Sequence, residues 1–403
     1  MNNKSIVLYF QLHQPYRVKR YTIFDTAHDH VYFNDEGESD KNNKAVFERV
    51  AEKSYRPMTE LLEKLMYEQP DFRFSLSITG VFLEQAAQWA PDIIESVQRM
   101  VASGRVELLS ETYHHSLAFF HSKSEFETQV ALHREAIFKT FGVIPLVFRN
   151  TELAYNDELA SWAAGRGYKT ILAEGWDTAL DWRSPNHVYR AAGSDTLALM
   201  LKNYRLSDDL AFRFSDQRWA EWPLTAGKYI DWLHSSDDSG SIINLFMDFE
   251  TFGEHQWEST GIFQFFADFV KEWSVSHGAF STISQAVEAH EPVDTVSMPQ
   301  TITWADAERD LSAWNGNELQ KEALRHVYDL EHEIIQTEDA DLIADWRKLL
   351  TSDHFYYMAT KWHEDGNIHA YFSPYDSPYD AFLSYMNVIR DIRWRVMQHR
   401  KGL

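Results

Sequence analysis

The sequence contains no cysteine, so disulfide bonds and thiolate metal sites are both excluded. It also lacks any run of about 18 to 20 apolar residues, which a membrane-spanning helix needs. The apolar run at residues 6–10 is too short for the core of a signal peptide, and no small-residue cleavage site follows it. We therefore expect a cytoplasmic protein.

Basic residues are scarce relative to acidic ones. The chain has 38 Lys and Arg against 61 Asp and Glu, which gives a formal net charge of −23, and no block of Lys or Arg stands out. A surface with this charge repels phosphate backbones and anionic lipids, so nucleic acids and membranes are not expected partners. A neutral polymer feels little of this repulsion. The oligomeric state remains unknown from the sequence.

Aromatic residues are plentiful, since Trp, Tyr and Phe make up 15% of the 403 residues. Their flat faces suit the apolar faces of sugar rings. A large aromatic core is the alternative explanation, and it accounts for most of the 26 Phe. Hydrophobic residues reach 44%, which is enough for one large core and a smaller second unit.

Short apolar runs alternate with helical patterns through the first two-thirds of the chain. Most of these runs are nearly continuous, as expected of parallel strands that are buried on both faces. Helical patterns such as 82–103 and 124–141 lie between them and end at Gly104 and Gly142. The alternation predicts an α/β fold with a parallel sheet. The predicted strands are 5–12, 72–79, 106–110, 146–149, 170–173, 197–202 and 242–248.

Seven strands are one fewer than a standard (β/α) barrel has, which favours an incomplete or seven-stranded (β/α) barrel. On periodicity alone, a doubly wound open sheet is the alternative. After residue 292 the pattern changes to long amphipathic helices at 306–336, 339–358 and 381–398. We therefore predict a barrel domain over residues 1–292 and an α-helical domain over residues 293–403.

Polar side chains follow the predicted strands. In a β/α barrel the carboxyl ends of the strands meet on one face, where the active site forms. Cleavage of a glycosidic bond needs two carboxyl groups that flank the bond. Any one of the available carboxylates could instead cap a helix or pair with an arginine. The candidates are Glu111, Glu152, Glu174, Asp248 and Glu250.

Five separated blocks carry a resemblance to a known family. They read HQP at 13–15, GVFLEQ at 80–85, FRNTELAYN at 148–156, MDFETFGEHQW at 247–257 and WADAERDLSAW at 304–314. In this order they resemble the five characteristic regions of glycoside hydrolase family 57, specifically of its α-amylase group. The third and fourth blocks are the most specific.

The resemblance implies a seven-stranded (β/α) barrel followed by a helical region. It also implies a retaining glycosidase that acts on α-1,4-glucans, with Glu152 as the nucleophile and Asp248 as the acid/base. The expected substrate is an α-glucan or a malto-oligosaccharide, and no cofactor is expected. A 4-α-glucanotransferase that acts on the same substrates is an alternative, and so is a catalytically silent glucan-binding protein.

Further residues at the strand ends are candidate contacts to a sugar. The histidines could bind hydroxyl groups or stabilise a charged transition state, or they could be ordinary residues at the barrel mouth. The tryptophans could stack on glucose rings or pack in the core. Asp306 and Asp310 share one face of the predicted helix, from which Asp306 could enter the cleft. The predicted substrate-binding residues are His13, Gln14, Glu84, His114, Trp176, His255, Trp257, Trp304 and Asp306.

A metal-dependent deacetylase or mannosidase on a related barrel is the rival class of enzyme. Such a site needs an Asp near the first strand and a pair of histidines at ligand spacing. His28, Asp29 and His30 offer this pattern, but they lie in a polar loop well past the first strand. We therefore expect no metal site.

Overall fold

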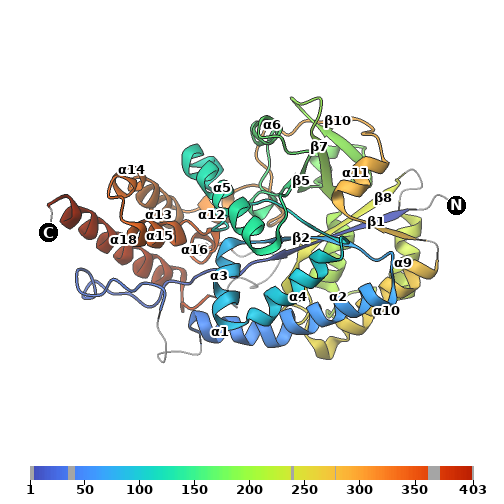
Figure 1. Cartoon of the computed structure of the whole chain (residues 1–403), viewed down its shortest axis with the longest axis horizontal. Helices are drawn as coiled ribbons and strands as arrows, with labels where there is room; N and C mark the ends of the chain where they lie inside the picture. The colour runs from blue at the N-terminus through green and yellow to red at the C-terminus, as the bar shows by residue number, and fades with distance from the viewer. Residues whose placement is uncertain (1–3, 35–40, 237–239, 277, 362–372, 402–403) are drawn as a thin grey trace.

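The strands of the protein form two sheets. The computed structural model describes residues 4–34, 41–236, 240–276, 278–361 and 373–401. The first sheet has the order β3-β2-β1-β8, with β9 paired to β1, and the second has the order β10-β6-β7-β5-β4 (Figure 1). All pairs are parallel except β6 with β7. The strands are β1 (Ser5–Leu12), β2 (Phe74–Ile78), β3 (Val106–Leu108), β4 (Val147–Phe148), β5 (Thr170–Glu174), β6 (Val188–Ala191), β7 (Ala198–Lys202), β8 (Ile242–Asp248), β9 (Ala279–Ser281) and β10 (Thr295–Val296).

Two seams join the sheets into a ring. Between β3 and β4, Ser110 N donates to Val147 O and Arg149 N donates to Ser110 O, both at 2.9 Å. Between β7 and β8, Asn203 N donates to Asn244 O at 2.9 Å, and Asn244 Nδ2 donates to Leu201 O at 2.9 Å. The parallel strands β1, β2, β3, β4, β5, β7 and β8 thus close a seven-stranded (β/α) barrel.

The seven predicted strands are the seven strands of this ring, so the predicted fold class is confirmed. Every residue of β1 is buried, as the continuous apolar run predicted for a strand covered on both faces. Three strands, β6, β9 and β10, were not predicted. Each has four residues or fewer.

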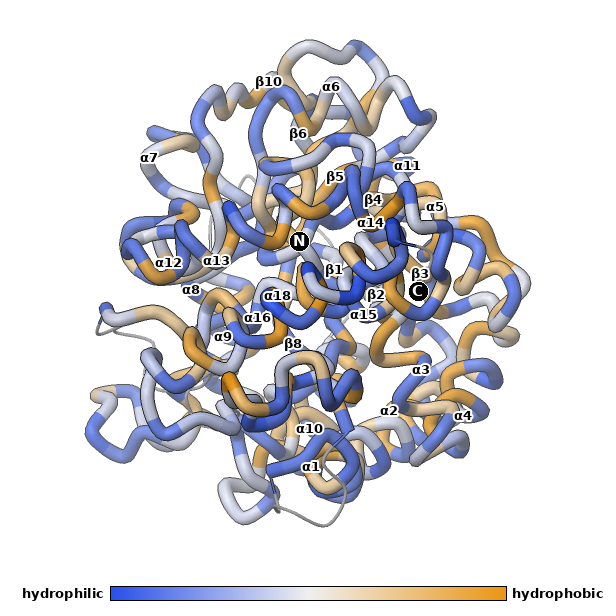
Figure 2. The backbone as a smooth tube through the Cα atoms, turned by 90° about the vertical axis from the view of Figure 1, so that its left-hand side faces the viewer, coloured by the Kyte–Doolittle hydropathy of each residue, from blue (hydrophilic) through white to orange (hydrophobic). Residues whose placement is uncertain are grey.

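Helices α1 to α11 pack around the barrel, and Figure 2 shows α2, α3, α4 and α10 at the periphery of the strands. The predicted helix at 82–103 is wrong as a single helix, because Pro91 has no N–H to continue it and instead begins α4. The predicted helix at 124–141 is confirmed, and it ends at Gly142 in the left-handed conformation (φ 73°). These helices are α1 (Asn43–Val50), α2 (Arg56–Glu68), α3 (Gly80–Trp89), α4 (Pro91–Ala102), α5 (Lys123–Phe141), α6 (Asp157–Gly165), α7 (Asp177–Leu180), α8 (Tyr204–Asp208), α9 (Ala226–Ser235), α10 (Ile262–Val275) and α11 (Ile283–Ala289).

The C-terminal helices form a separate bundle at one end of the molecule (Figure 1). The predicted helix at 306–336 is wrong in its first turn, because Asp306 and Arg309 have positive φ (54° and 53°). The remainder is divided into three shorter helices, so the predicted continuity is wrong as well. Asp306 and Asp310 therefore do not share a helical face. The predicted helix at 339–358 is interrupted at residues 350–351, and the one at 381–398 is confirmed within α18. The helices are α12 (Ser312–Asn315), α13 (Glu318–Tyr328), α14 (Glu331–Ile335), α15 (Ala340–Leu349), α16 (Ser352–Tyr356) and α18 (Pro378–Arg400).

The segment that follows β1 ties the barrel to this bundle. Val18, Tyr21 and Tyr32 belong to the apolar cluster of the C-terminal helices. The buried carboxylate of Asp391 on α18 accepts hydrogen bonds from Ala27 N at 2.6 Å, from His30 Nδ1 at 2.7 Å and from the Tyr32 hydroxyl. The predicted domain boundary at residue 292 remains a proposal. Strand β10 lies after this boundary in the sequence but pairs with β6, which lies before it.

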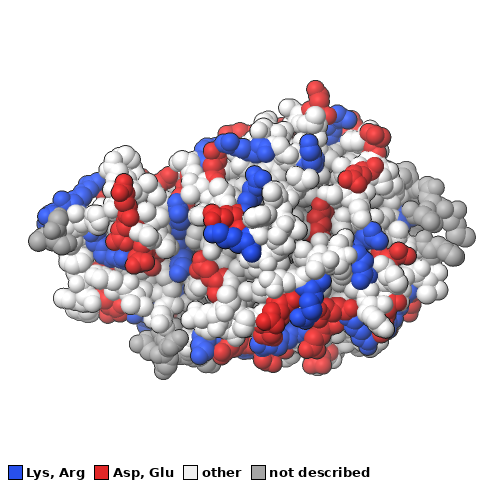
Figure 3. All heavy atoms as spheres, viewed as in Figure 1, with Lys and Arg blue, Asp and Glu red and all other residues white. Residues whose placement is uncertain are grey.

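Charged side chains of both signs are interspersed on the face seen in Figure 3, where Asp and Glu lie close to Lys and Arg. Among the described residues, no helix is long and apolar enough to cross a bilayer. The expectation that nucleic acids and membranes are not partners remains a prediction.

The seam between β7 and β8 generates a stability prediction. Asn244→Val removes the side-chain donor to Leu201 O and to Pro185 O (3.2 Å) inside the barrel. Leaving buried carbonyl groups without a donor should destabilise the fold by about 1–3 kcal/mol. Thermal unfolding measures this change. Thr295→Val, at an exposed position of β10, is the control and should stay within about 0.5 kcal/mol. Equal midpoints for the two variants would show that the seam does not depend on Asn244.

Candidate active site

A pocket opens at the carboxyl ends of the barrel strands. Its walls come from the ends of β1, β4, β7 and β8, from the loop after β3, and from the segment 304–306 and helix α16 beyond the barrel. The pocket is therefore built jointly by the barrel and the C-terminal region. It is lined by Gln11, His13, Gln14, Pro15, Arg17, His115, Glu152, Lys202, Ala211, Phe212, Phe246, Met247, Asp248, Glu250, Thr251, His255, Trp304, Ala305, Asp306, Asp353 and Tyr356.

Glu152 is held at the end of β4 by contacts to both of its carboxylate oxygens. His115 Nε2 lies 3.1 Å from Oε1, and Trp304 Nε1 donates to Oε2 at 2.7 Å. Ser352 Oγ, at the start of α16, donates to Oε1 at 3.4 Å. Glu152 and Leu153 both have positive φ (59° and 49°), a strained backbone of the kind that clusters at functional sites. The carboxylate thus has a fixed orientation.

Asp248 and Glu250 both line the pocket at the end of β8. Strand alternation alone would point Glu250 to the side opposite Asp248, but β8 ends at Asp248 and the chain turns as a 3-10 helix over Phe249–Thr251. Burial and the negative charge of Asp248 raise the pKa of Glu250 to about 8, although Tyr55 OH donates to it at 2.5 Å. A neutral carboxyl group therefore lies beside Asp248 at neutral pH.

The other two candidate carboxylates are partners of arginines. Glu111 lies 3.7 Å from Arg149 Nη1, and Arg309 Nη1 donates to Glu174 Oε2 at 2.8 Å. Burial raises the pKa of Glu174 to about 7, against the opposing effect of Lys202 and Arg309. Neither residue is part of the pocket lining, and each pairs with an arginine as the alternative interpretation expected.

Trp304 is fixed by cations on its ring and by a bond to its backbone. The Arg149 guanidinium lies 5.1 Å and the Lys202 ammonium 5.2 Å from the ring centroid. Arg309 Nη1 donates to Trp304 O at 2.7 Å, and this bond holds the backbone of the segment that carries Trp304 and Asp306. The indole N–H is thereby directed at Glu152.

The predicted substrate-binding residues divide into two groups. His13, Gln14, His255, Trp304 and Asp306 line the pocket together with Glu152 and Asp248. Outside the pocket lining, Glu84 accepts from Tyr113 OH at 2.8 Å, and Trp176 packs against an apolar cluster of the barrel. Also outside it, His114 is buried with its ring against Tyr113, and Trp257 is exposed beneath the Lys53 ammonium. The roles of all nine residues remain predictions.

Sequence reasoning did not single out His115, Lys202 and Asp353, which also line the pocket. His115 follows His114 directly, and Lys202 is the last residue of β7, so both stood at a predicted strand end. Asp353 lies on α16 in the C-terminal bundle, where no strand end marks it.

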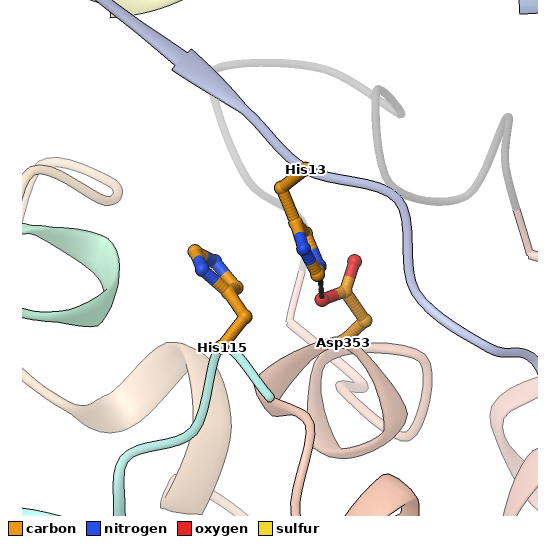
Figure 4. Close-up of side chains that lie close together, drawn as sticks. All are labelled: His13, His115 and Asp353. Carbon is orange, nitrogen blue, oxygen red and sulfur yellow. Dashed lines mark hydrogen bonds and ion pairs between the residues drawn. The ribbon is translucent and has the colours of Figure 1, made fainter. Parts of the chain in front are cut away.

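His13, His115 and Asp353 offer ligating atoms within 4.8 Å of one another (Figure 4). The two rings are stacked at 4.0 Å with 22° between their planes, so their in-plane lone pairs do not converge on one point as zinc ligands do. His13 Nε2 instead lies 3.1 Å from Asp353 Oδ2. The cluster fits a hydrogen-bonded array better than a metal centre.

The rival histidine pair at 28–30 lies in the segment that binds the C-terminal bundle. His30 contacts Asp391, and Asp29 Oδ2 accepts from Lys19 Nζ at 2.6 Å. The expected absence of a metal remains a prediction.

The family model for glycosyl hydrolase family 57 matches residues 7–299. The chain is 38% identical over 411 residues to a Methanocaldococcus jannaschii protein named "Putative alpha-amylase", covering 98% of this chain and 85% of that protein. The chain belongs to glycosyl hydrolase family 57. The family is one of glycosidases, which agrees with a pocket that holds two or more carboxyl groups.

Solved structures of two enzymes share the fold of this family 57 chain. A branching enzyme from Pyrococcus horikoshii has a TM-score of 0.70 at 13% identity and covers 100% of this chain and 92% of that one. A 4-alpha-glucanotransferase from Thermococcus litoralis has a TM-score of 0.69 at 15% identity and covers 98% of this chain. The present chain spans 60% of the length of that glucanotransferase. At these identities the likeness is one of fold alone.

The raised pKa of Glu250 generates a prediction about pH and stability. The neutral carboxyl group stabilises the fold at low pH, and this contribution is lost as the pH rises through its folded-state pKa of about 8. Glu250→Gln stays neutral throughout. Its thermal midpoint should therefore rise relative to the wild type between about pH 5 and about pH 8, as measured by scanning calorimetry. Glu258→Gln, at an exposed position, is the control. A difference between Glu250→Gln and wild type that does not change with pH would contradict the assignment.

Proposed function

We propose that this protein cleaves α-1,4-glucosidic bonds of α-glucans and malto-oligosaccharides with retention of anomeric configuration. One observation carries the proposal: Glu152 and Asp248 line the same pocket, and both oxygens of Glu152 are held by donors. Family membership and the name of the Methanocaldococcus jannaschii relative support the choice of substrate.

The mechanism is a double displacement. The Glu152 carboxylate attacks the anomeric carbon while Asp248 protonates the departing oxygen, which gives a covalent glycosyl-enzyme. Asp248 then takes a proton from water, and the water oxygen attacks the same carbon and releases Glu152. His115 and Trp304 hold Glu152 by hydrogen bonds and so keep its attack in one direction.

Histidine and aromatic side chains of the pocket suit the rest of the sugar. His13 is neutral, because burial and the charge of His115 lower its pKa to about 4. Its ring nitrogens contact Thr79 Oγ1 at 3.0 Å and Asp353 Oδ2 at 3.1 Å, which fixes the ring in the pocket wall. Phe212, Trp304 and Tyr356 supply aromatic surface to the pocket wall, which suits the apolar face of a glucose ring.

Product analysis on maltoheptaose tests the proposal. Shorter sugars and new reducing ends, released first as the α-anomer in proton NMR, are the expected result. An initial β-anomer would exclude retention. Longer sugars without a rise in reducing ends would indicate a 4-α-glucanotransferase, and binding without any product would indicate a silent glucan-binding protein.

Glu152→Gln should abolish turnover. The amide is too weak a nucleophile to form the covalent intermediate, so kcat on maltoheptaose should fall by roughly 10⁴-fold or more while the thermal midpoint changes little. Glu158→Gln is the matched control, because Glu158 lies nearby on α6 with its side chain 68% exposed. Activity of Glu152→Gln close to that of the control would refute the assignment of the nucleophile.

Asp248→Asn should slow the cleavage of substrates whose leaving group needs a proton more than the cleavage of substrates whose leaving group does not. On starch the variant lacks the general acid, and its rate should fall by about 10²- to 10⁴-fold. A malto-oligosaccharide with a nitrophenolate leaving group needs little protonation, so release of nitrophenol in the first turnover should fall by no more than about 10-fold. Equal losses on the two substrates, in steady-state and stopped-flow assays, would assign the acid to another residue.

A further inference from the structure

A row of alternating charges lies behind Glu152 in the barrel. His115 Nε2 is 3.1 Å from Glu152 Oε1, and His115 Nδ1 is 3.7 Å from Glu111 Oε2. On its other side, Glu111 lies 3.7 Å from Arg149 Nη1. Gln11 Nε2 donates to Glu111 Oε2 at 2.9 Å. All four charged side chains are at most 8% exposed, so the row lies almost wholly out of water.

Both ring nitrogens of His115 face carboxylates. A neutral imidazole has one N–H and one lone pair, so in the neutral form one nitrogen would direct its lone pair at a negative oxygen. The doubly protonated ring presents an N–H group to each carboxylate, as a hydrogen bond to Glu152 at 3.1 Å and as a longer ion pair with Glu111 at 3.7 Å. Burial lowers the pKa of His115, but the carboxylates of Glu111 and Glu152 outweigh this and raise it to about 9.

The neighbours of this row are consistent with one positive charge on His115. The stacked ring of His13, from the segment after β1, is neutral, which avoids two adjacent imidazolium rings. Asp353 Oδ2 of α16 lies 3.1 Å from His13 Nε2. Behind the row, His133 of α5 accepts from Glu111 N at 3.3 Å, and burial lowers its pKa.

The backbone of His115 has φ 51°, a left-handed conformation that is uncommon for histidine. This turn inserts the ring between the two carboxylates. Glu111 accounts for the charge of the ring, because with Glu152 alone a neutral ring with its proton on Nε2 would suffice.

We propose that Glu111 is a positioning residue that keeps His115 doubly protonated, so that the Nε2–H group always points at Glu152. A neutral His115 could move its proton to Nδ1 and turn a lone pair toward Glu152, which would repel the carboxylate and release its orientation. The inference rests on the proposed role of Glu152 as the nucleophile. It assigns to Glu111 the task of holding that nucleophile ready for attack.

The first test reads the protonation of His115 directly. Full-length protein with ¹⁵N-labelled histidine is titrated by NMR as wild type, Glu111→Gln and Glu107→Gln, with the His115 signals assigned from His115→Asn. Glu107 is the matched control, because it is a partly buried glutamate on β3, shortly before Glu111, and its carboxylate binds Ser75 and Ser284. The midpoint of His115 should fall by about one pH unit or more in Glu111→Gln and stay unchanged in Glu107→Gln. An unchanged midpoint in Glu111→Gln overturns the proposal.

The second test reads the consequence for the reaction. On maltoheptaose, Glu111→Gln should lower kcat by about 10- to 100-fold with KM within about 3-fold of wild type. The ratio of its kcat to that of wild type should fall further from about pH 6 to about pH 8, because the neutral fraction of His115 grows with pH. A ratio that is the same at every pH would reduce Glu111 to a structural role and overturn the proposal.

Glu111→Asp keeps the negative charge and is the control for an effect that comes only from loss of folding. It should keep His115 doubly protonated and should restore most of the lost kcat; a midpoint as low as that of Glu111→Gln would count against the proposal. The NMR titration needs no substrate. An unaltered His115 midpoint in Glu111→Gln is therefore a failure of this proposal, whereas full activity of Glu152→Gln is a failure of the proposed function.

Discussion

Parallel strands need long crossovers, and in this barrel each crossover brings the polar end of the next strand to the same rim. The whole site depends on that geometry. Glu152 lies in the turn that follows β4, and Asp248 is the last residue of β8; ring closure through the seams at Ser110 and Asn244 brings these distant segments to one pocket. The strands themselves are apolar and buried, so their pairing is strongly specified by burial.

The barrel alone does not complete the pocket. Trp304 and Asp306 come from the segment that leaves the barrel, and Asp353 comes from α16. The loop after β1 holds the two parts together, with Tyr21 and Tyr32 in the apolar cluster of the bundle and Asp391 accepting three hydrogen bonds from that loop. Donors to the carboxylate of Glu152 thus come from the loop after β3, from the segment beyond the barrel and from α16.

The sequence predicted the ring strands and the carboxylates at their ends, because continuous apolar runs and the polar residues after them are local signals. It did not predict His115, whose ring reaches Glu152 through a backbone with positive φ, or Asp353, which no local pattern marks. The first turn of the helix expected at 306–336 was predicted wrongly for a similar reason. Asp306 and Arg309 adopt positive φ, and the bonds from Arg309 to Glu174 and to Trp304 O join parts of the fold that are remote in sequence.

A pocket whose walls come from two structural units has a consequence for how such enzymes diversify. A helical bundle that merely capped the barrel could be exchanged for another without touching the chemistry. Here α16 supplies Ser352 to Glu152 and Asp353 to His13, so the bundle and the strand ends must change together. Recombination between distant relatives at the junction would join halves whose hydrogen bonds do not match. New specificities should therefore arise by substitution and loop insertion around the rim, with the bundle inherited along with its own barrel.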